Sequence, residues 1–578
     1  MGKVSARDIA AQLREMGERL ALERGNPYRA KAYIRAAENL ALSTAPVDEL
    51  IAAGRLTEIP GIGEALAGVI VDIFNTGQSK KLLAMREDAP AGLLELLKIP
   101  GLRGDRVKKL HEVLGISSLA DLEKAAKTDV LKNTKGFGPA FQTKVLQGLE
   151  MISGPERRHI HRAAAAADTA IKQLGRDPAV TRVVPTGEIR RASELVGRVS
   201  LLAVVPSDAR SRAPTSADVD VISTDEDHFG ISLLLSTGSD RHVAALRALA
   251  EKKGLALDEN GLRRGRTIIA SATEEEIYGA LDLPYIAPEL RESGAEVELA
   301  RLGKLPPLVT HEDLRGVLHA HTVESDGADT LEDMAAAARK RGYQYLGLTE
   351  HSQSAAYAGG LTPAEVESQQ RKIDKLNKKL GASFHVFKGI ESDILGDGSL
   401  DYPEDVLKTF DFIIASVHSK FKLSAREQTQ RILTAIANPY TTVIGHVTGR
   451  QLLRRPGYEV DMEAVLEACA KHGVALEINA HPWRLDVDWR WCARGLALGC
   501  MFSVNPDAHS TREIDNVRWG ISMARKGGVP REGVLNALDR RAFAAYVQQR
   551  KERASLAKTR RRAPSAGRAK ARAAAADR

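Results

Sequence analysis

Seven short apolar runs between residues 318 and 509 each contain or precede a side chain that can bind a metal ion. The first run, Leu318–Thr322, contains His319 and His321, and Asp326 follows it. The other six lead into His351, Glu391, His418, His446, Glu477 with Asn479, and Asp507 with His509. Amphipathic segments of helix length separate the runs, so the pattern predicts parallel strands with crossover helices. The carboxyl ends of such strands meet at one mouth of a barrel, where we expect these side chains to converge.

A single histidine at the end of an apolar run is usually a structural residue, but nine imidazoles and carboxylates in equivalent places predict one shared site. The nine candidate ligands are His319, His321, Asp326, His351, Glu391, His418, His446, Asp507 and His509. Because the set lacks thiolates, it favours manganese, zinc or iron at an open site over a closed structural zinc. Nine ligands are too many for one ion. We therefore expect two or three divalent ions, with positions left for water and a phosphate oxygen.

The motifs around these residues resemble those of the PHP (polymerase and histidinol phosphatase) phosphoesterases over residues 312–545. The matching segments are His319–Thr322 with Ser325–Gly327, Thr349–Ser352, Gly389–Asp393, Ser416–His418, Gly445–His446 and Pro506–His509. The resemblance implies one ion on His319, His321, Glu391 and Asp507, a second on Glu391, His418 and His446, and a third on Asp326, His351 and His509. It also implies that Glu391, Asp507 and His321 are catalytic, with Glu391 bridging two ions. Arg450 is a candidate phosphate contact, or else an arginine that pairs with a carboxylate.

The chain of 578 residues is long enough for several domains, and three cysteines without regular spacing indicate a reducing cytosol rather than a disulfide framework. No apolar run approaches about 20 residues, so we expect a cytoplasmic protein without a membrane span. The net charge of +8 is concentrated at the end, where eleven Lys and Arg from Arg550 onward stand against Glu552 and Asp577. We expect a disordered basic tail that attracts polyanions, or one that serves only solubility.

Three glycine-containing turns lie between helical segments in the first 150 residues. They are Ile59–Gly63, Ile99–Gly104 and Lys135–Pro139, with Gly61, Gly63, Gly101, Gly104, Gly136 and Gly138 as candidate DNA-binding residues. Glycine lets the chain turn tightly, so that backbone N–H groups at the start of the next helix can face a phosphate. The threefold repeat resembles the helix-hairpin-helix element, which implies DNA binding without base readout. Arg103 stands where the middle copy should have its second glycine, which makes the grip of that copy less certain.

The segments around these turns resemble family X DNA polymerases to about residue 300. Gly25–Tyr33, with Arg29 and Lys31, resembles the first DNA-binding helix of that family, and Thr237–His242 and Gly254–Leu262 resemble its passage from palm to thumb. A family X polymerase followed by a PHP domain is the architecture of the bacterial PolX proteins. The resemblance implies a multidomain fold: an α-helical helix-hairpin-helix region, an α+β polymerase-like palm and thumb, and a distorted (β/α)7 PHP barrel. The predicted domains are 1–85 (helix-hairpin-helix), 86–152 (fingers-like), 153–235 (palm-like), 236–303 (thumb-like), 308–548 (PHP) and 549–578 (disordered basic tail).

The palm-like segment departs from the family at the residues that hold magnesium. The family pattern places two aspartates on the palm strand, but Arg198 and Ser200 stand there, and only Asp220 fits the third aspartate. A guanidinium cannot bind magnesium and repels it, so we expect polymerisation to be lost. Val69 occupies the position of the family's lyase lysine, and valine has no amine to attack a sugar aldehyde.

These observations predict a metal-dependent phosphoesterase that acts on DNA, as a 3′–5′ exonuclease or 3′-end-processing repair enzyme whose polymerase-like half holds DNA without polymerising. We expect sequence-independent binding to gapped, nicked or 3′-ended DNA, and a monomer. Four alternatives remain: an endonuclease at abasic sites, a small-molecule phosphatase of the histidinol-phosphatase type, an active family X polymerase, and a purely structural DNA-binding protein. An active polymerase would need a palm metal site rebuilt from Glu188, Glu194, Asp218 or Asp220.

Overall fold

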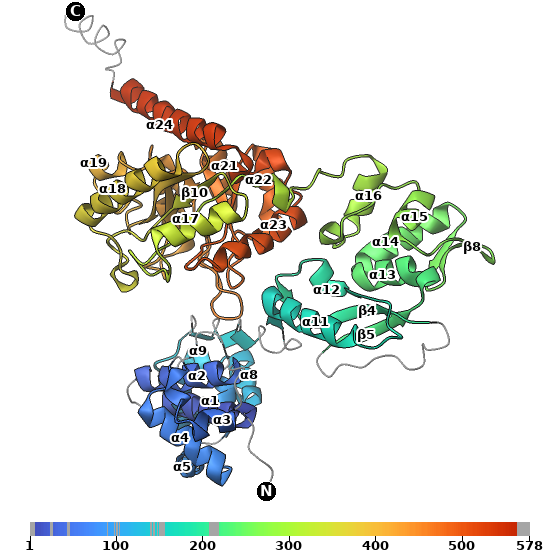
Figure 1. Cartoon of the computed structure of the whole chain (residues 1–578), viewed down its shortest axis with the longest axis horizontal. Helices are drawn as coiled ribbons and strands as arrows, with labels where there is room; N and C mark the ends of the chain where they lie inside the picture. Colours follow the sequence, from blue (N-terminus) through green and yellow to red (C-terminus); the bar gives the residue numbers. More distant parts are fainter. Residues whose placement is uncertain are drawn as a thin grey trace, which may run out of the picture. The chain divides into compact units, whose positions relative to one another are not determined.

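The computed structural model divides into two compact units, Met1–Glu156 with Leu453–Arg455, and Arg157–Leu452 with Pro456–Arg578 (Figure 1). The structure describes residues 6–22, 27–42, 47–59, 61–88, 91–97, 99, 102, 104–138, 141–142, 145–146, 148–149, 157–206 and 219–562. Gly101, Arg103 and Asp218, which the sequence singles out, lie outside these residues. Within the described ranges, no helix is both long and apolar enough to cross a membrane.

Helices form the described part of the first unit. They are α1 (Ala6–Leu22), α2 (Pro27–Leu42), α3 (Val47–Ala52), η1 (Leu56–Glu58), α4 (Glu64–Thr76), α5 (Lys80–Asp88), α6 (Ala91–Leu96), α7 (Gly104–Leu114), α8 (Leu119–Lys127) and α9 (Val130–Asn133). α1 and α2 pack so closely that a β-carbon on Gly17 would lie 2.7 Å from Ile34 Cγ1. One core gathers around Ile70 of α4, and a second around Val107 and Leu122 of α7 and α8. The first predicted hairpin therefore lies beside one core, and the second and third lie beside the other.

A small mixed sheet and one long helix form the palm-like part of the second unit. The elements are β1 (Arg158–His159), α11 (Ile160–Leu174), β2 (Arg182–Pro185), α12 (Gly187–Arg190), β3 (Leu195–Val196), β4 (Ser200–Val204), β5 (Asp220–Thr224), η3 (Glu226–His228) and α13 (Phe229–Thr237). Ala163 and Ala167 of α11 pack with Leu201 of β4. β2 runs antiparallel to β4, and β5 runs parallel to β4 with Ser200 opposite Asp220. The sheet therefore places positions 200 and 220 side by side.

The thumb-like part combines helices with a three-stranded antiparallel sheet. The elements are α14 (Asp240–Lys252), β6 (Ala256–Asp258), β7 (Gly261–Arg264), β8 (Thr267–Ala270), α15 (Glu274–Ala280), η4 (Pro288–Leu290) and α16 (Ala295–Arg301). Its core packs around the fully buried Tyr278. A buried ion pair between Arg291 and Glu274 accompanies this core. His242 Nδ1 lies 2.8 Å from Glu296 Oε1 in a hydrogen bond, and burial lowers the pKa of this imidazole.

Seven parallel strands form the barrel of the second unit. They are β9 (Gly316–Val317), β10 (Tyr345–Leu348), β11 (His385–Asp393), β12 (Phe412–Ser416), β13 (Val443–Ile444), β14 (Ala475–Asn479) and β15 (Phe502–Asn505). Their hydrogen-bonded order follows the sequence from β9 to β15. Ala320 pairs with Ala508 in a parallel bridge, which joins the segments after β9 and β15 and nearly closes the barrel. The predicted barrel and the multidomain fold class are confirmed.

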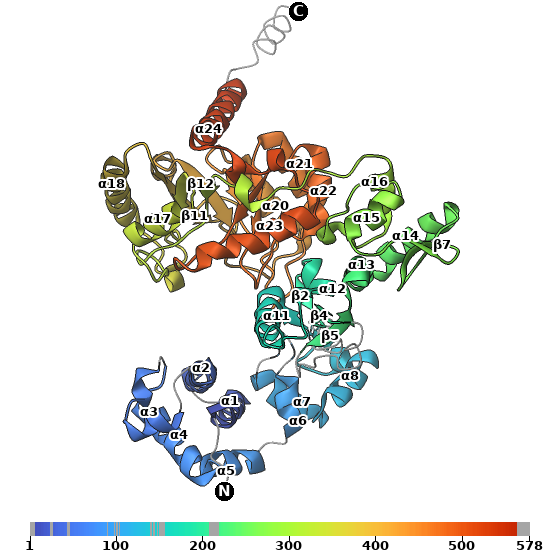
Figure 2. The same cartoon turned by 45° about the vertical axis from the view of Figure 1, so that its right-hand side comes forward.

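Crossover helices surround these strands, as Figures 1 and 2 show from two sides. The helical elements are η5 (His311–Asp313), α17 (Leu331–Lys340), η6 (Ala356–Ala358), α18 (Pro363–Leu380), α19 (Glu404–Leu407), α20 (Ala425–Ala437), α21 (Met462–His472), η7 (Trp489–Trp491), α22 (Cys492–Leu498), η8 (Glu513–Asn516), α23 (Val517–Lys526), η9 (Arg531–Gly533), η10 (Leu535–Ala537) and α24 (Arg540–Arg562). Capping boxes begin two of the longer helices, with Thr362 and Glu365 at α18 and Ser424 and Glu427 at α20. These local signals fix where the helices begin.

α24 packs against the end of the barrel where the strands begin. Phe543 is fully buried and stacks on Tyr345, the first residue of β10, with ring centroids 5.2 Å apart. About two helical turns after Phe543, the buried Arg550 donates hydrogen bonds to two carbonyl oxygens at the end of α20. Residues 549–562, which the sequence assigns to a disordered tail, continue this helix, and Arg550 and Lys551 bind carbonyl oxygens of the barrel. The rest of that tail lies outside the described residues.

Candidate metal centre and nucleic-acid interface

The nine predicted ligands gather at the carboxyl ends of the barrel strands. Glu391 lies within β11, Asp326 lies on the loop after β9, and the other seven lie two to four residues beyond the end of a strand. His319, His321 and Glu391 have no exposed surface, whereas the side chain of Asp326 is 34% exposed. The barrel therefore brings all nine residues to one mouth, with Asp326 on its open side.

Glu391 lies at the centre of this cluster. The distances from its Oε1 are 2.9 Å to His446 Nε2 and 3.3 Å to Nε2 of both His418 and His319, and from its Oε2 3.0 Å to His351 Nδ1 and 3.7 Å to His321 Nε2. One carboxylate thus faces five imidazoles. A carboxylate with two oxygens directed at different imidazoles is suited to bridge two cations, because each oxygen can bind one of them.

Asp507 and Asp326 extend the cluster to either side of Glu391. Asp507 Oδ1 lies 3.4 Å from Nε2 of both His319 and His321, and Asp326 Oδ1 lies within 3.5 Å of His351 Nε2 and 3.4 Å of His509 Nε2. The donor atoms form three groups, each within 4.8 Å: His321, Asp326, His351 and His509; His319, His321 and Asp507; and His351, Glu391 and His418. These groups overlap with the three sets that the PHP resemblance implies. They differ from those sets in three ways: His321 and His351 each belong to two groups, Glu391 belongs to only one, and His446 belongs to none.

The buried polar atoms of the cluster fit a divalent cation. Within the described residues, six of them have no hydrogen-bond partner: His319 Nε2, both ring nitrogens of His321, His351 Nδ1, Glu391 Oε2 and His446 Nδ1. A buried polar atom without a partner costs free energy, so such a concentration requires a ligand that satisfies it. Imidazole nitrogens and carboxylate oxygens are donors that manganese, zinc and iron accept. The cluster can therefore hold divalent metal ions.

Two further carboxylates orient the imidazoles from behind. Glu477 Oε1 lies 2.6 Å from His319 Nδ1, and Asp393 Oδ1 lies 2.6 Å from His418 Nδ1. Such contacts fix the ring orientation of a metal-binding histidine and leave its Nε2 for the ion. Asn479 donates from Nδ2 to both Glu477 and Asp507 at 3.1 Å. The sequence places these residues at strand ends, but its pattern does not separate orienting carboxylates from ligands.

Charges within the cluster shift the pKa values of its members. Burial opposes protonation of His351, but the carboxylates of Glu391 and Asp326 outweigh it and raise its pKa to about 10. Burial likewise opposes protonation of His418, whose pKa nevertheless rises to about 9 because of Glu391 and Asp393. By contrast, burial and the neighbouring His509 lower the pKa of His321 to about 3. Against burial, the carboxylates also raise the pKa values of His319 and His509. Bound cations would neutralise the carboxylate charge that favours protonation of these imidazoles, so metal binding at this site should release protons.

The backbone is strained at three candidate ligands. His319, His446 and Asp507 have φ angles of 63°, 21° and 53°, in the region that side-chain-bearing residues rarely adopt. Strain of this kind persists only when the surrounding structure fixes it, and it collects at functional sites. The sequence gives no sign of it, because none of the three is a glycine.

Arg450, the candidate phosphate contact, is bound to protein partners instead. Its guanidinium pairs with Glu194 and with Asp488, whose Oδ2 lies 3.1 Å away, and its Nε donates to the carbonyl oxygen of Arg484 at 3.0 Å. This geometry agrees with the alternative interpretation of the sequence, in which Arg450 pairs with carboxylates. Arg484, which the sequence reasoning missed, has its Nε 3.6 Å from Asp507 Oδ2 and is the guanidinium that borders the cluster.

The degenerate palm positions form an exposed ion pair. Arg198 Nε lies 2.9 Å from Asp220 Oδ2, and the side chains are 81% and 54% exposed. Glu188, one candidate for a rebuilt site, accepts a hydrogen bond from the backbone N–H of Gly197 at 2.7 Å. Glu194, another, is paired with Arg450 in the barrel. The described carboxylates of the palm therefore do not gather around a common centre.

The glycine turns of the first unit present backbone next to basic side chains. Gly61, Gly136 and Gly138 have φ angles of 82°, 95° and 82°, which only glycine adopts without strain. Gly63 caps the amino terminus of α4, and a β-carbon on Gly104 would lie 1.8 Å from a backbone oxygen of α1. The predicted contacts Arg29 and Lys31 are exposed on α2.

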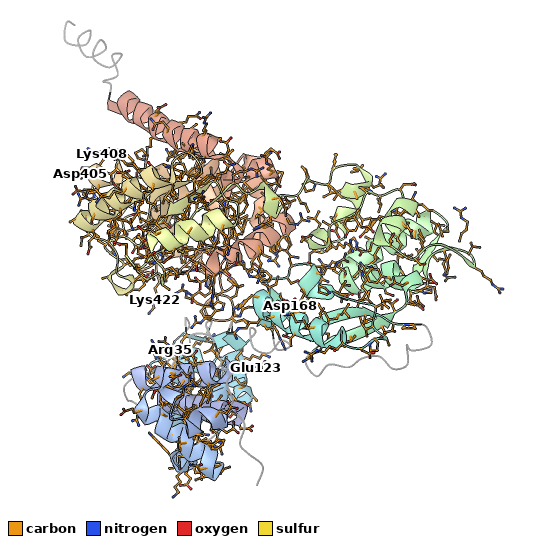
Figure 3. The ribbon with its side chains drawn as sticks, in the orientation of Figure 1. Arg35, Glu123, Asp168, Asp405, Lys408 and Lys422 are labelled. Carbon is orange, nitrogen blue, oxygen red and sulfur yellow. The ribbon has the colours of Figure 1, made fainter. Side chains whose placement is uncertain are left out.

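Basic side chains also flank two of these turns. Arg35, labelled in Figure 3, lies against the first turn, since a β-carbon on Gly61 would be 3.3 Å from its Cγ. At the third turn, Arg106 donates to the carbonyl oxygen of Gly136 at 2.7 Å, and Lys109 packs against the same glycine. Both turns thus combine exposed backbone with positive charge, as a phosphate-binding surface requires. Val69 is half-buried in the same unit and offers no amine.

Four family models match parts of the chain. They are a helix-hairpin-helix domain over residues 5–79, a SAM-like helix-hairpin-helix tandem over 93–140, the DNA polymerase beta thumb over 232–292, and the PHP domain over 318–481. The first two cover the glycine turns, and the last covers the strands β10 to β14. The matches indicate DNA binding by the first half and metal-dependent hydrolysis by the barrel.

Three curated relatives illustrate two kinds of similarity. The DNA polymerase/3′-5′ exonuclease PolX of Bacillus subtilis (strain 168) is 32% identical over 573 residues, which cover 94% of this chain and 99% of that protein. A probable phosphatase of Thermoanaerobacter sp. (strain X514) is 28% identical over 41% of this chain and 95% of its own length. A probable phosphatase of Caldicellulosiruptor saccharolyticus is 34% identical over 38% of this chain and 90% of its own length. The first relative is matched along nearly its whole length.

Proposed function

The chain belongs to the PolX family, and we propose that it is a metal-dependent phosphoesterase that removes nucleotides from DNA 3′ ends, as a 3′–5′ exonuclease or 3′-end-processing repair enzyme. The observation that carries the proposal is the convergence of three carboxylates and six histidines at one barrel mouth, with Glu391 facing five of the imidazoles. The Bacillus subtilis relative, whose name includes a 3′-5′ exonuclease, supports it over 94% of the chain.

We assign two or three ions, of manganese, zinc or iron, to the nine ligands His319, His321, Asp326, His351, Glu391, His418, His446, Asp507 and His509. Eight of them belong to the three groups of donor atoms, and His446 joins them through Nε2, which lies 2.9 Å from Glu391 Oε1. Bound ions supply an activated water and neutralise the negative charge of the scissile phosphate. Glu391, Asp507 and His321 hold the centre of the cluster, and Asp393 and Glu477 keep two imidazoles turned toward it. Arg484 beside Asp507 supplies a guanidinium that suits a phosphate oxygen.

The polymerase-like half holds the DNA without extending it. The hairpin glycines Gly61, Gly63, Gly101, Gly104, Gly136 and Gly138, with Arg29 and Lys31, contact the sugar-phosphate backbone of gapped, nicked or 3′-ended DNA without reading its sequence. Positive charge at two of the turns and the helix-hairpin-helix models support this role. The ion pair of Arg198 with Asp220 supports the loss of polymerisation, because a guanidinium at a magnesium position repels the ion. We place the protein in the cytosol as a monomer.

The assay that tests this function measures nucleotide release from a 3′-labelled gapped duplex with manganese, zinc or magnesium. We expect manganese-dependent release by the native protein and none by His321→Ala or Glu391→Ala. His385→Ala is the matched control, because His385 begins β11 at the opposite end of the same strand. Undiminished release by the His321 and Glu391 variants would contradict the proposed site.

A small-molecule phosphatase is the second candidate, and the matches to two proteins named probable phosphatases favour it. The two functions differ in whether the hairpins matter for turnover. Comparing hydrolysis of p-nitrophenyl phosphate with release from the 3′-labelled duplex separates them. A small-molecule phosphatase would hydrolyse the monoester much faster than the duplex, and its hairpins would not affect turnover. Our proposal predicts faster release from the duplex than hydrolysis of the monoester.

A further inference from the structure

Two exposed apolar side chains stand on loops that begin at ligands of the metal cluster. Among the large hydrophobic residues that the structure describes, Tyr357 is 75% exposed and Val323 is 52% exposed, more than any other. Exposed apolar surface costs free energy in water, and single exposed residues of this kind are common on proteins. Here the two most exposed ones lie on the two loops that also carry the ligands His351 and His321, which calls for a functional explanation.

The loop that carries Tyr357 is fixed to the cluster at both of its ends. The backbone N–H of Ala355 donates to Ser352 at 2.9 Å, and that of Leu361 donates to the carbonyl oxygen of His351 at 2.9 Å. Between them, η6 displays Tyr357, and Gly359 follows with a φ of 67°. A β-carbon on Gly359 would lie 3.2 Å from the carbonyl oxygen of Ser325, so this loop packs directly on the loop after His321.

The Tyr357 side chain is close enough to the cluster to feel its charges. Surrounding protein atoms, followed by the carboxylates of Asp393, Glu391 and Asp326, raise the pKa of its hydroxyl to about 12. Within the described residues, this hydroxyl has no hydrogen-bond partner and the ring has no aromatic neighbour. The ring is therefore neutral and exposed, and it stands on the loop that begins at the ligand His351.

Val323 stands on the neighbouring loop, two residues after the ligand His321. Its backbone N–H donates to Asp329 at 3.0 Å, and the backbone N–H of Ala328 donates to the carbonyl oxygen of His509 at 2.7 Å, so this loop is also fixed to the cluster. An aromatic face beside a phosphate site is the arrangement that proteins use to bind unpaired bases, because every base has a face that stacks on an aromatic ring. Val323 adds exposed apolar surface on the neighbouring loop.

We propose that Tyr357 is the stacking platform for the terminal base of the 3′ end, with Val323 as a further apolar contact beside it. The inference rests on the proposed nuclease function and names the residue that would contact the base of the terminal nucleotide. Tyr357 is a specificity residue, since it touches the substrate's base rather than the reacting phosphate.

The test compares two 3′-labelled single strands that differ only in the last residue, one with a normal nucleotide and one with a tetrahydrofuran abasic analogue. We expect the native protein to favour the normal end in kcat/KM by on the order of 10-fold, the usual size of a stacking contribution. Tyr357→Ala should bring the ratio of the two substrates close to one, mainly through a higher KM for the normal end. Tyr357→Phe should keep the preference, because the ring and not the hydroxyl stacks.

Leu302→Ala is the matched control, because it removes an apolar side chain that is 47% exposed in the thumb-like part. Its substrate ratio should equal that of the native protein. An equal loss on both substrates, or an unchanged ratio, in Tyr357→Ala with an unaltered melting temperature would overturn the inference. Absence of release from both substrates by the native protein would instead contradict the proposed function, so the two failures are distinguishable.

Discussion

The barrel mouth and the palm sheet are two places where carboxylates could hold cations, and they differ in what surrounds those carboxylates. In the barrel, Glu391 is fully buried among five imidazoles, and Asp393 and Glu477 support the rings from behind. In the palm, Asp220 is half exposed and faces the guanidinium of Arg198. A parallel strand register puts positions 200 and 220 opposite each other, where they present a serine and an aspartate that is paired with Arg198.

This difference indicates that strand pairing and the ligand cluster depend on different residues in this chain. The sheet pairing of β4 with β5 depends on backbone hydrogen bonds and apolar packing, which Arg198 and Ser200 do not disturb. The barrel cluster depends on nine side chains at equivalent strand ends. The backbone is strained at His319 and Asp507, and the surrounding packing holds these two residues in place.

The largest effect should come from the centre of the barrel cluster. Glu391→Gln keeps the size of the side chain but removes the charge that faces five imidazoles. We expect nuclease activity to fall by at least about 1,000-fold, since groups that act as a unit lose most of their effect together. Metal content measured on the purified variant should fall as well, while gel-shift affinity for DNA stays the same. A variant that keeps both its metal and its activity would remove the contrast between barrel and palm.

The contact between palm and barrel should give the next largest effect. Arg450 is largely buried with Glu194 of the palm and Asp488 of the barrel, and Arg450→Ala leaves both carboxylates without this partner. We expect a loss of about 3 kcal/mol in the free energy of unfolding, as for other buried pairs broken on one side.

Tryptophan fluorescence during urea unfolding measures this loss, because all four tryptophans lie between residues 483 and 519. Arg490→Ala is the control, since Arg490 pairs with the same Asp488 but is 62% exposed and should cost far less. Equal costs for the two variants would show that the palm contributes nothing to the stability of the barrel.

A smaller effect is expected from the residues that orient the ligands. Asp393→Asn keeps a hydrogen-bonding group beside His418 but removes the charge that holds its ring. We expect metal affinity or activity to fall by about 10- to 100-fold, the usual cost of losing such a contact. Titrating manganese against activity separates the two, because a weaker metal site is rescued at high manganese. Loss that no manganese concentration restores would mean that Asp393 has another role.

The smallest effect should come from the palm. Arg198→Ala removes an exposed ion pair, and such pairs contribute less than about 0.5 kcal/mol to stability. Nuclease activity, metal content and the urea midpoint should all remain within error of the native values. A marked fall in nuclease activity in this variant would mean that the palm site takes part in the reaction, and would end the division of roles proposed above.

The sequence is sufficient for the barrel because each strand and its ligand are signalled within a few residues. Local alternation of apolar runs and amphipathic segments predicts β10 to β15, and their ends predict where His351 or His418 lies. The partner of Arg450 could not be predicted in this way, because Glu194 is 256 residues away in the chain. The stacking of Phe543 on Tyr345 is also a long-range contact. The sequence pattern therefore does not reveal that α24 continues to Arg562. Positive φ angles at non-glycine residues leave no mark in a sequence.

The central claim is that the barrel cluster cuts DNA while the palm no longer extends it. One primer-extension gel tests both parts, with a 5′-labelled primer on a gapped template, manganese or magnesium, and all four nucleotides. The account predicts that the native protein only shortens the primer and that His321→Ala leaves it unchanged. A primer that grows longer, in the native protein or in His321→Ala, would contradict the account.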